Sequence, residues 1–233
     1  MSDLPGGKIS NRPLHFIWIL DTSWSMEGTK IGQLNFAIKE TLPAMKDTAG
    51  DNPNADVLVR VVTFSSGARW HVAQPTPVDQ FTWSDIAADG VTDMGKALSL
   101  VAEQLRMPPM EPRALPPVLV LVSDGYPTDD FETGLRDLMN EPWGKRAVRL
   151  AIGMGEDTDL AVLSKFIGHQ EIKPLEANNA STLVQFIRWV STAVLKSASM
   201  PVAPPKDGQP SRPPIPVPPP PQPDPKNTGD DVW

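Results

Sequence analysis

The sequence has 233 residues, including 27 prolines, three histidines and no cysteine, and its formal net charge is −7. The absence of cysteine excludes disulfide scaffolds, zinc knuckles and thiol nucleophiles, and the acidic balance argues against nucleic-acid binding, which needs a basic surface. No apolar run is long enough to span a membrane and the first residues lack the features of a signal peptide, so we expect a cytoplasmic protein.

Apolar runs and helical periods alternate along most of the chain. Runs typical of strands buried on both faces lie at 14–20, 56–64, 118–122 and 146–152, with a short antiparallel edge strand expected at 69–72 and a short last strand near Lys173. Apolar residues at helical spacing predict helices at 31–45, 94–105, 131–138, 160–166 and from 183 to about 197. This alternation predicts an α/β fold with a doubly wound, mostly parallel central sheet and helices on both faces.

Proline is concentrated in the last part of the sequence. Residues 201–233 hold 13 of the 27 prolines and few apolar residues, too few to offset the entropy of ordering the segment. We therefore predict an N-terminal extension at 1–12, one domain at 13–200 and a disordered proline-rich tail at 201–233. The run at 213–221 favours a polyproline II conformation, either as a spacer or as a docking peptide.

Oxygen-bearing side chains gather where the expected strands end. The first strand leads into Asp21, followed by Ser23 and Ser25; Asp124 follows the strand at 118–122, and Thr92 precedes a helix. The carboxyl ends of such strands are where α/β sheets form their sites. Taken singly, each residue also fits a helix cap or a turn. Together they form a set of hard oxygen donors that suits Mg²⁺, with Mn²⁺ and Ca²⁺ as alternatives.

These residues carry a family resemblance that covers essentially the whole domain. Asp21-x-Ser23-x-Ser25, Thr92 within Gly-x-Thr-x-x-Gly and Asp124 within Ser-Asp-Gly resemble the metal-ion-dependent adhesion site of von Willebrand factor A domains, with all five positions filled. The resemblance implies that Ser23 and Ser25 bind the metal directly, Thr92 directly or through water, and the two aspartates directly or behind bridging waters. It implies a binding module, not an enzyme, whose metal takes a carboxylate from a protein partner.

A shorter match suggests a subfamily. The continuation from Asp124 to Asp129, Asp-Gly-Tyr-Pro-Thr-Asp, is similar to intracellular proteins associated with bacterial tellurium resistance, which implies a partner protein kinase and protein phosphatase in a stress system. An adaptor of a AAA+ ATPase is an alternative. A metal-dependent phosphohydrolase using Asp21 is the competing class. A haloacid-dehalogenase-like phosphatase, however, would need an acid where Ser23 stands, and neither a phosphate-binding Gly-rich loop with Lys nor a Gly-x-Ser-x-Gly elbow occurs.

Two further residues beside this motif are candidates for a partner interface. Trp24 stands between the two serines, where a small residue, often glycine, is usual in the family. Its indole is either a packing residue or an anchor at an interface. Asp93, next to Thr92, either adds charge near the metal or faces water as most surface acids do.

Overall fold

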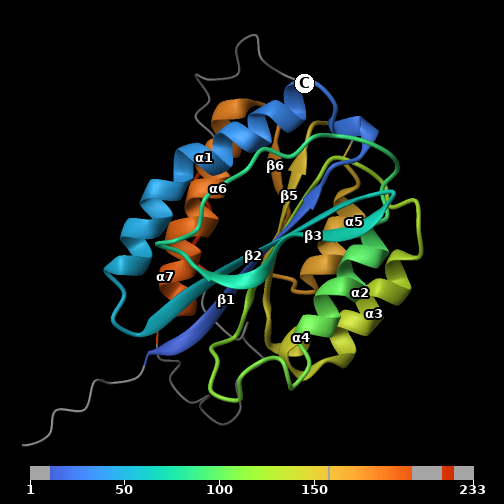
Figure 1. Cartoon of the computed structure of the whole chain (residues 1–233). Helices are drawn as coiled ribbons and strands as arrows, with labels where there is room; N and C mark the ends of the chain where they lie inside the picture. The colour runs from blue at the N-terminus through green and yellow to red at the C-terminus, as the bar shows by residue number, and fades with distance from the viewer. Residues whose placement is uncertain (1–10, 157, 201–216, 223–233) are drawn as a thin grey trace, which may run out of the picture.

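The near-continuous apolar runs form the middle of a six-stranded sheet in the computed structural model, which describes residues 11–156, 158–200 and 217–222 (Figure 1). The strands are β1 (Arg12–Asp21), β2 (Ala55–Ser65), β3 (Gly67–Pro77), β4 (Val118–Ser123), β5 (Val148–Met154) and β6 (Leu175–Ala177). Their order is β3-β2-β1-β4-β5-β6, and every neighbouring pair is parallel except β2 and β3. The predicted doubly wound, mostly parallel sheet is confirmed.

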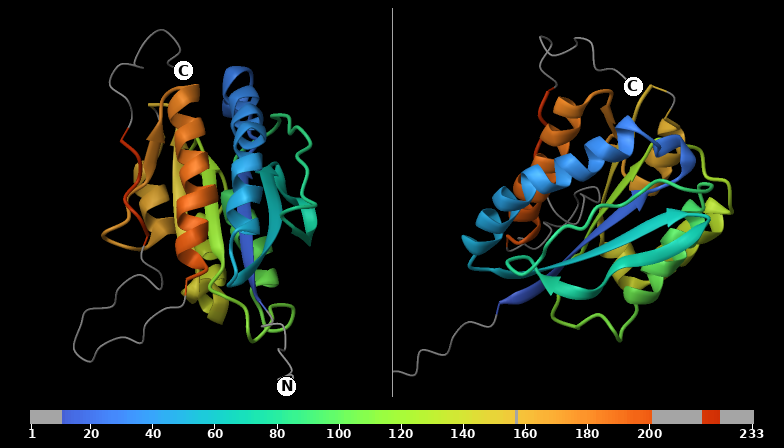
Figure 2. Two further views of the ribbon diagram at one scale, coloured as in Figure 1. Left: turned by 90° about the vertical axis from the view of Figure 1, so that its left-hand side faces the viewer. Right: turned by 45° about the horizontal axis from the view of Figure 1, so that its top comes forward.

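Helices cover both faces of this sheet. They are the 3₁₀ turn η1 (Trp24–Met26), α1 (Thr29–Gly50), α2 (Met94–Gln104), α3 (Phe131–Asn140), α4 (Pro142–Arg146), α5 (Leu160–Ile167), α6 (Ala180–Trp189), the π-helical turn η2 (Val190–Val194) and α7 (Leu195–Ala198). Helices α1, α6 and α7 lie on one face and α2, α3 and α5 on the other (Figures 1 and 2). Alternate residues of β1 supply the two cores, with Phe16 and Trp18 facing α1 and Ile17 and Ile19 facing α2.

Some elements differ from the sequence-based expectation. The edge strand is longer than 69–72, because β3 pairs with β2 from Gly67 to Pro77 although none of its side chains is buried and the apolar pattern is weak. The last strand begins two residues after Lys173. Helix α1 runs through Pro43 to Gly50. Helix α4 was not predicted, because five residues are too few to show a helical period.

The two predicted flanking segments lie mostly outside the described residues. Residues 1–10, 201–216 and 223–233 are outside them, so the expected extension and the expected disorder of the tail stay predictions there. Within 217–222, Val217 is partly buried against the core on the α1 and α6 face. Among the described residues, none of the helices has the length and apolar character needed to cross a membrane.

Candidate metal centre

The candidate site lies where the strand order changes direction. From β1 the chain winds outward to β2, whereas β4, β5 and β6 follow one another on the other side of β1, so β1 and β4 are neighbours that are far apart in the sequence. Leu20 is opposite Val122 in this pairing, which sets the ends of both strands side by side. In an open α/β sheet this reversal leaves a crevice outside the carboxyl ends of the strands. Asp21 and Asp124 both come to this crevice.

Asp21 is fully buried and hydrogen-bonded through both carboxylate oxygens. Oδ1 accepts a hydrogen bond from the Ser23 backbone N–H at 2.8 Å, and Oδ2 accepts one from the Ser123 hydroxyl at 2.5 Å. Burial raises the pKa of Asp21 to about 6, against the opposing effect of these hydrogen bonds, and the nearby charge of Asp124 also raises it. In the metal-free protein, the burial of Asp21 therefore lowers the free energy of unfolding. The loss grows as the pH rises from about 4 to about 6, because in this range the unfolded chain releases the Asp21 proton and the folded protein retains it.

The two serines of the motif connect Asp21 to Asp124. The Ser23 and Ser25 hydroxyl oxygens are 2.9 Å apart, and the Ser25 hydroxyl donates to Oδ1 of Asp124 at 2.6 Å. The loop that carries them is held from both sides, since Met26 is fully buried beneath it and the Trp24 N–H donates to the Gly90 carbonyl at 2.9 Å. The loop thus holds its hydroxyls toward Asp124.

Thr92 reaches the site from the loop before α2. Its N–H donates to the Thr128 hydroxyl at 3.0 Å, and its carbonyl accepts from the Thr128 N–H at 2.8 Å, so this loop is fixed to the loop after β4. A Cβ added at Gly125 would lie 3.5 Å from the Ser25 hydroxyl oxygen and 3.6 Å from that of Thr92. The backbone of Gly125 therefore lies beside both hydroxyls, and the structure brings the five predicted residues together.

The loop after β4 is fastened to the start of α2 through the side chain of Asp129. Both carboxylate oxygens of Asp129 accept backbone N–H groups at the start of α2, from Gly95 and Lys96, each at 2.8 Å. Asp130 caps α3, accepting from the Thr133 N–H at 3.0 Å. Asp129 thus caps a different helix, and in doing so sets Thr92 against the Asp124 loop.

Lys30 is a site residue that sequence reasoning missed. Its ammonium group pairs with Oδ2 of Asp124, whose side chain is fully buried, while the Lys30 side chain is 21% exposed. A cation in the first turn of a helix is disfavoured by the helix dipole, so this ion pair is what keeps the ammonium there. The sequence held no local signal for this role, because a lysine in a first helical turn usually faces solvent.

Asp93 does not fit the interface role expected for it. It is 8% exposed, and Oδ2 accepts the Gly67 N–H at 2.7 Å and the Lys96 ammonium at 2.6 Å. The hydrogen bond from Lys96 is the main reason that the pKa of Asp93 is lowered. Its carboxylate joins the β2–β3 turn to α2. Trp24, by contrast, is 60% exposed, so it is a surface residue and not a packing residue.

The donor set decides which ions suit the site. Within the described parts of the chain, no three His, Cys, Asp or Glu side chains come together as a metal cluster. The site instead combines two carboxylates with three neutral hydroxyls, all oxygen, which is chemistry for Mg²⁺ and its hard relatives. The ammonium of Lys30 on Asp124 acts as a stand-in cation, and Gly125 leaves the space beside the hydroxyls free of a side chain. The residues therefore fit a divalent cation.

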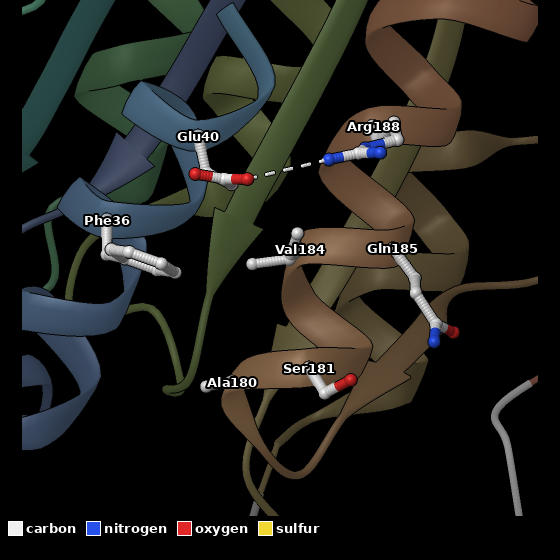
Figure 3. Close-up of a pocket in the computed structure, with 7 residues that line it drawn as sticks. All are labelled: Phe36, Glu40, Ala180, Ser181, Val184, Gln185 and Arg188. Atoms are coloured by element: carbon white, nitrogen blue, oxygen red, sulfur yellow. Dashed lines mark ion pairs between the residues drawn. The ribbon is translucent and has the colours of Figure 1, made fainter.

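A cleft of about 500 Å³ lies elsewhere, between α1 and α6 (Figure 3). Phe36 and Glu40 line it from α1, and Val184 and Arg188 line it from α6. The Arg188 guanidinium is 3.8 Å from the Glu40 carboxylate, and both side chains are about half exposed. This cleft holds none of the five motif residues.

Comparisons with known proteins point to one family. The profile of the von Willebrand factor type A domain matches residues 17–186. Similar solved structures include the ArnB paralog VWA2 from Sulfolobus acidocaldarius (21% identity, TM-score 0.57, 76% of this chain and 45% of that one) and a von Willebrand factor type A protein from Catenulispora acidiphila (17%, 0.59, 81% and 43%). Another is proximal thread matrix protein 1 from the mussel byssus with a zinc-occupied metal-ion-dependent adhesion site (MIDAS) motif. It has 16% identity and a TM-score of 0.56, and the match covers 81% of this chain and 48% of that one. The chain thus spans less than half the length of each of these proteins, and no curated protein matches it.

Proposed function

The chain belongs to the von Willebrand factor type A domain family, a family known for metal-dependent protein interaction, and from this premise we propose that it is a protein-binding module. In this proposal the module holds a divalent cation, Mg²⁺ in the first place and Mn²⁺ or Ca²⁺ as alternatives, among Asp21, Ser23, Ser25, Thr92 and Asp124. Through the cation it takes up a carboxylate from a partner protein.

One observation carries the proposal: a connected chain of oxygens that ends on an internal cation. It runs from Ser23 through Ser25 to Asp124, and the Lys30 ammonium closes it. Two carboxylates and one ammonium leave this buried site with a surplus negative charge, and burial makes such a surplus costly unless a further cation compensates it. The mussel byssus protein, similar in fold and described with a zinc-occupied MIDAS motif, supports a divalent ion at the equivalent place.

The chain's own residues set how a ligand would bind. Both oxygens of Asp21 already accept hydrogen bonds, from Ser23 and Ser123. This carboxylate therefore orients the loop and contributes negative charge next to the hydroxyls that would bind the cation. The hydroxyls of Ser23, Ser25 and Thr92 are neutral donors and leave the charge of a bound cation largely uncompensated. When bound, the cation supplies a Lewis-acid centre that accepts an anionic oxygen. A carboxylate from another protein matches that requirement.

Trp24 is the proposed interface anchor next to the metal. Its exposed indole stands between the two serines, and a buried indole at an interface can contribute about 2 kcal/mol. Trp24→Gly should leave metal binding and stability nearly unchanged and weaken partner binding about tenfold or more. A sharp loss of stability with unchanged affinity per folded molecule would contradict this role.

We propose that the site does not catalyse a reaction. Asp21, the one candidate nucleophile for phosphoryl transfer, is fully buried and hydrogen-bonded through both oxygens, which leaves it badly placed to attack a phosphate. Phosphoester and nucleotide hydrolysis should stay at background with Mg²⁺, Mn²⁺ or Ca²⁺. Saturable turnover that disappears in Asp21→Asn would favour the phosphohydrolase instead.

The biological setting is a narrower part of the proposal. The similarity of residues 124–129 to tellurium-resistance-associated proteins supports a cytoplasmic role beside a protein kinase and a protein phosphatase, and an adaptor of a AAA+ ATPase is the alternative. The kinds of protein encoded beside the gene discriminate between the two.

The experiment that tests the metal-binding proposal is calorimetric titration of the full chain with Mg²⁺ and with Mn²⁺. Saturable binding that is lost in Asp21→Ala is the expected result. If the wild-type chain binds neither ion, the proposed function is wrong.

A further inference from the structure

An apolar rim surrounds the opening of the candidate metal centre. Three large side chains on its three loops are exposed, Trp24 by 60%, Val91 by 47% and Tyr126 by 65%. They are neighbours in space as well, because Trp24 hydrogen-bonds to Gly90, the residue before Val91, and Gly125, the residue before Tyr126, lies beside the Thr92 hydroxyl. Large apolar side chains that gather at an exposed site mark an interaction surface. A ligand that fits here combines a carboxylate with apolar side chains.

The sequence of this chain contains such a ligand. Residues 230–233 are Asp-Asp-Val-Trp, two carboxylates followed at once by an aliphatic and an aromatic side chain. The other acids of the proline-rich segment lack this context, since Asp224 lies between two prolines and Asp207 follows Lys206. Residues 230–233 therefore offer carboxylates for the cation and apolar side chains for the rim.

The described part of the proline-rich segment is held on the domain at a suitable place. Val217 packs against the core to which α6 and β6 contribute, and Figure 2 shows residues 217–222 beside α6. Between β6 and the crevice at β1 and β4 there are two to three strand spacings, roughly 10–15 Å. The eight residues from Pro223 to Asp230, which follow Gln222, can span up to about 26 Å. The chain is thus long enough to cover the distance across these strands.

A tethered segment needs little intrinsic affinity to occupy such a site. A short flexible connection gives an effective concentration on the order of 1 mM, so a contact with a dissociation constant of about 0.2 mM would be occupied about five to one.

We propose that residues 230–233 bind in cis to the metal centre of the same chain, with an aspartate carboxylate on the cation and Trp233 on the apolar rim. The inference rests on the proposed function. An external partner would then compete with this segment, which makes it an autoinhibitory ligand.

Paramagnetic relaxation in the full chain tests the proposal. Bound Mn²⁺ broadens the NMR signals of nearby protons, and each tryptophan has one resolved indole N–H. Trp24 reports that the ion is bound at the site, Trp143 in α4 at the opposite end of the sheet serves as the distant control, and Trp233 is the probe. We expect broadening of Trp24 and Trp233 but not of Trp143, with assignments from single Trp→Phe variants.

Matched variants of the segment complete the test. Asp230→Asn combined with Asp231→Asn should remove the broadening of Trp233 and weaken the apparent Mn²⁺ affinity about fivefold. Asp224→Asn, which neutralises an acid between prolines, should change neither. A synthetic peptide of residues 229–233 should bind the metal-loaded double variant more tightly than the wild-type chain, because the site is then free.

The outcomes separate this inference from the proposed function. If Mn²⁺ broadens Trp24 but not Trp233, the metal site exists and the cis segment is wrong. If broadening of Trp233 fades on dilution while that of Trp24 persists, the segment comes from a second copy and the cis assignment is overturned. If calorimetry shows no metal binding at all, both proposals fail together.

Discussion

Two groups of buried polar side chains lie toward opposite ends of β1 and β2, and they differ in residual charge. At the carboxyl end are the metal-centre residues Asp21 and Asp124, with Lys30 as the compensating cation among the described residues. Toward the amino end, His15 Nε2 is 3.1 Å from a Glu111 carboxylate oxygen, and the guanidinium of the buried Arg60, from the middle of β2, donates to the Gln104 side chain at 3.0 Å.

The formal charges of the amino-end group cancel within the chain, whereas those of the carboxyl-end group do not. Burial is the main cause of the lowered pKa of His15, so this ring is neutral, and the charges of Arg60 and Glu111 offset each other. The Arg60 guanidinium also lies 5.8 Å from the centre of the Trp70 ring. Buried polar residues are therefore not by themselves a sign of function. An uncompensated charge beside neutral oxygen donors is the feature that indicates a ligand.

The largest expected effect comes from removing a carboxylate at the carboxyl end. Asp21→Ala should weaken Mg²⁺ binding by more than about 100-fold, because the Ser23 loop and the site's negative charge both depend on this side chain. The domain should stay folded by circular dichroism. Calorimetry on Arg60→Met, a buried charged residue at the other end, provides the control, and its Mg²⁺ affinity should stay within about twofold. Equal losses in the two variants would show that the two ends do not differ as described.

Metal addition should stabilise the protein only through the metal centre at the carboxyl ends of the strands. Mg²⁺ at about 100 times its dissociation constant contributes about 2.7 kcal/mol, or roughly 5–10 °C in melting temperature for a domain of this size. Removal of the ion with a chelator should reverse the shift. In Asp21→Ala the melting temperature should not respond to Mg²⁺, whereas Arg60→Met should respond as the wild type does. A shift that survives in Asp21→Ala would place the ion elsewhere.

Lys30 should oppose metal binding while it stabilises the metal-free protein. Lys30→Met leaves the buried Asp124 carboxylate without its cation, which should cost about 2 kcal/mol in the absence of metal, since the ammonium is partly exposed. The same change should tighten Mg²⁺ binding about fivefold or more, because the ion no longer displaces an ammonium. Lys39→Met, which removes an exposed pair with Asp85, is the matched control and should alter neither quantity. Weaker Mg²⁺ binding in Lys30→Met would mean that Lys30 supports the ion.

The smallest effect is a pH dependence at the amino end. The pKa of His15 is lowered in the folded protein, so above about pH 6.5 the ring is neutral in both states and costs nothing. As the pH falls below this value the unfolded chain takes up a proton that the folded protein does not, and stability decreases by at most about 1.4 kcal/mol per pH unit. Chemical denaturation between pH 7 and pH 5 should show that the stability of the wild type relative to His15→Leu decreases as the pH falls, a difference in which the opposite contribution of Asp21 cancels. The stability of the wild type relative to His71→Leu, on the edge strand, should stay constant. A constant difference between the wild type and His15→Leu would remove His15 as the origin of this pH dependence.

Much of the fold was predictable because its signals are local. Runs such as 14–20 and 118–122 are apolar on both faces, and each helical stripe repeats within one element, so the α/β class followed from the sequence. The full length of β3 was not predictable. Its side chains are only partly buried, and the strand exists because its backbone completes hydrogen bonds to β2, a contact that apolar periodicity does not record.

The sequence by itself determined the loop that carries Asp21, Ser23 and Ser25, since a strand end and two hydroxyls at alternate positions lie within five residues. The tertiary structure decided the rest of the site. The pairing of β1 with β4 set Ser123 against Asp21, α1 carried Lys30 onto Asp124, and the β2–β3 turn withdrew Asp93 from the surface. These contacts join residues up to about a hundred positions apart. Their charge balance follows from which chain segments pack together, and local spacing does not contain that information.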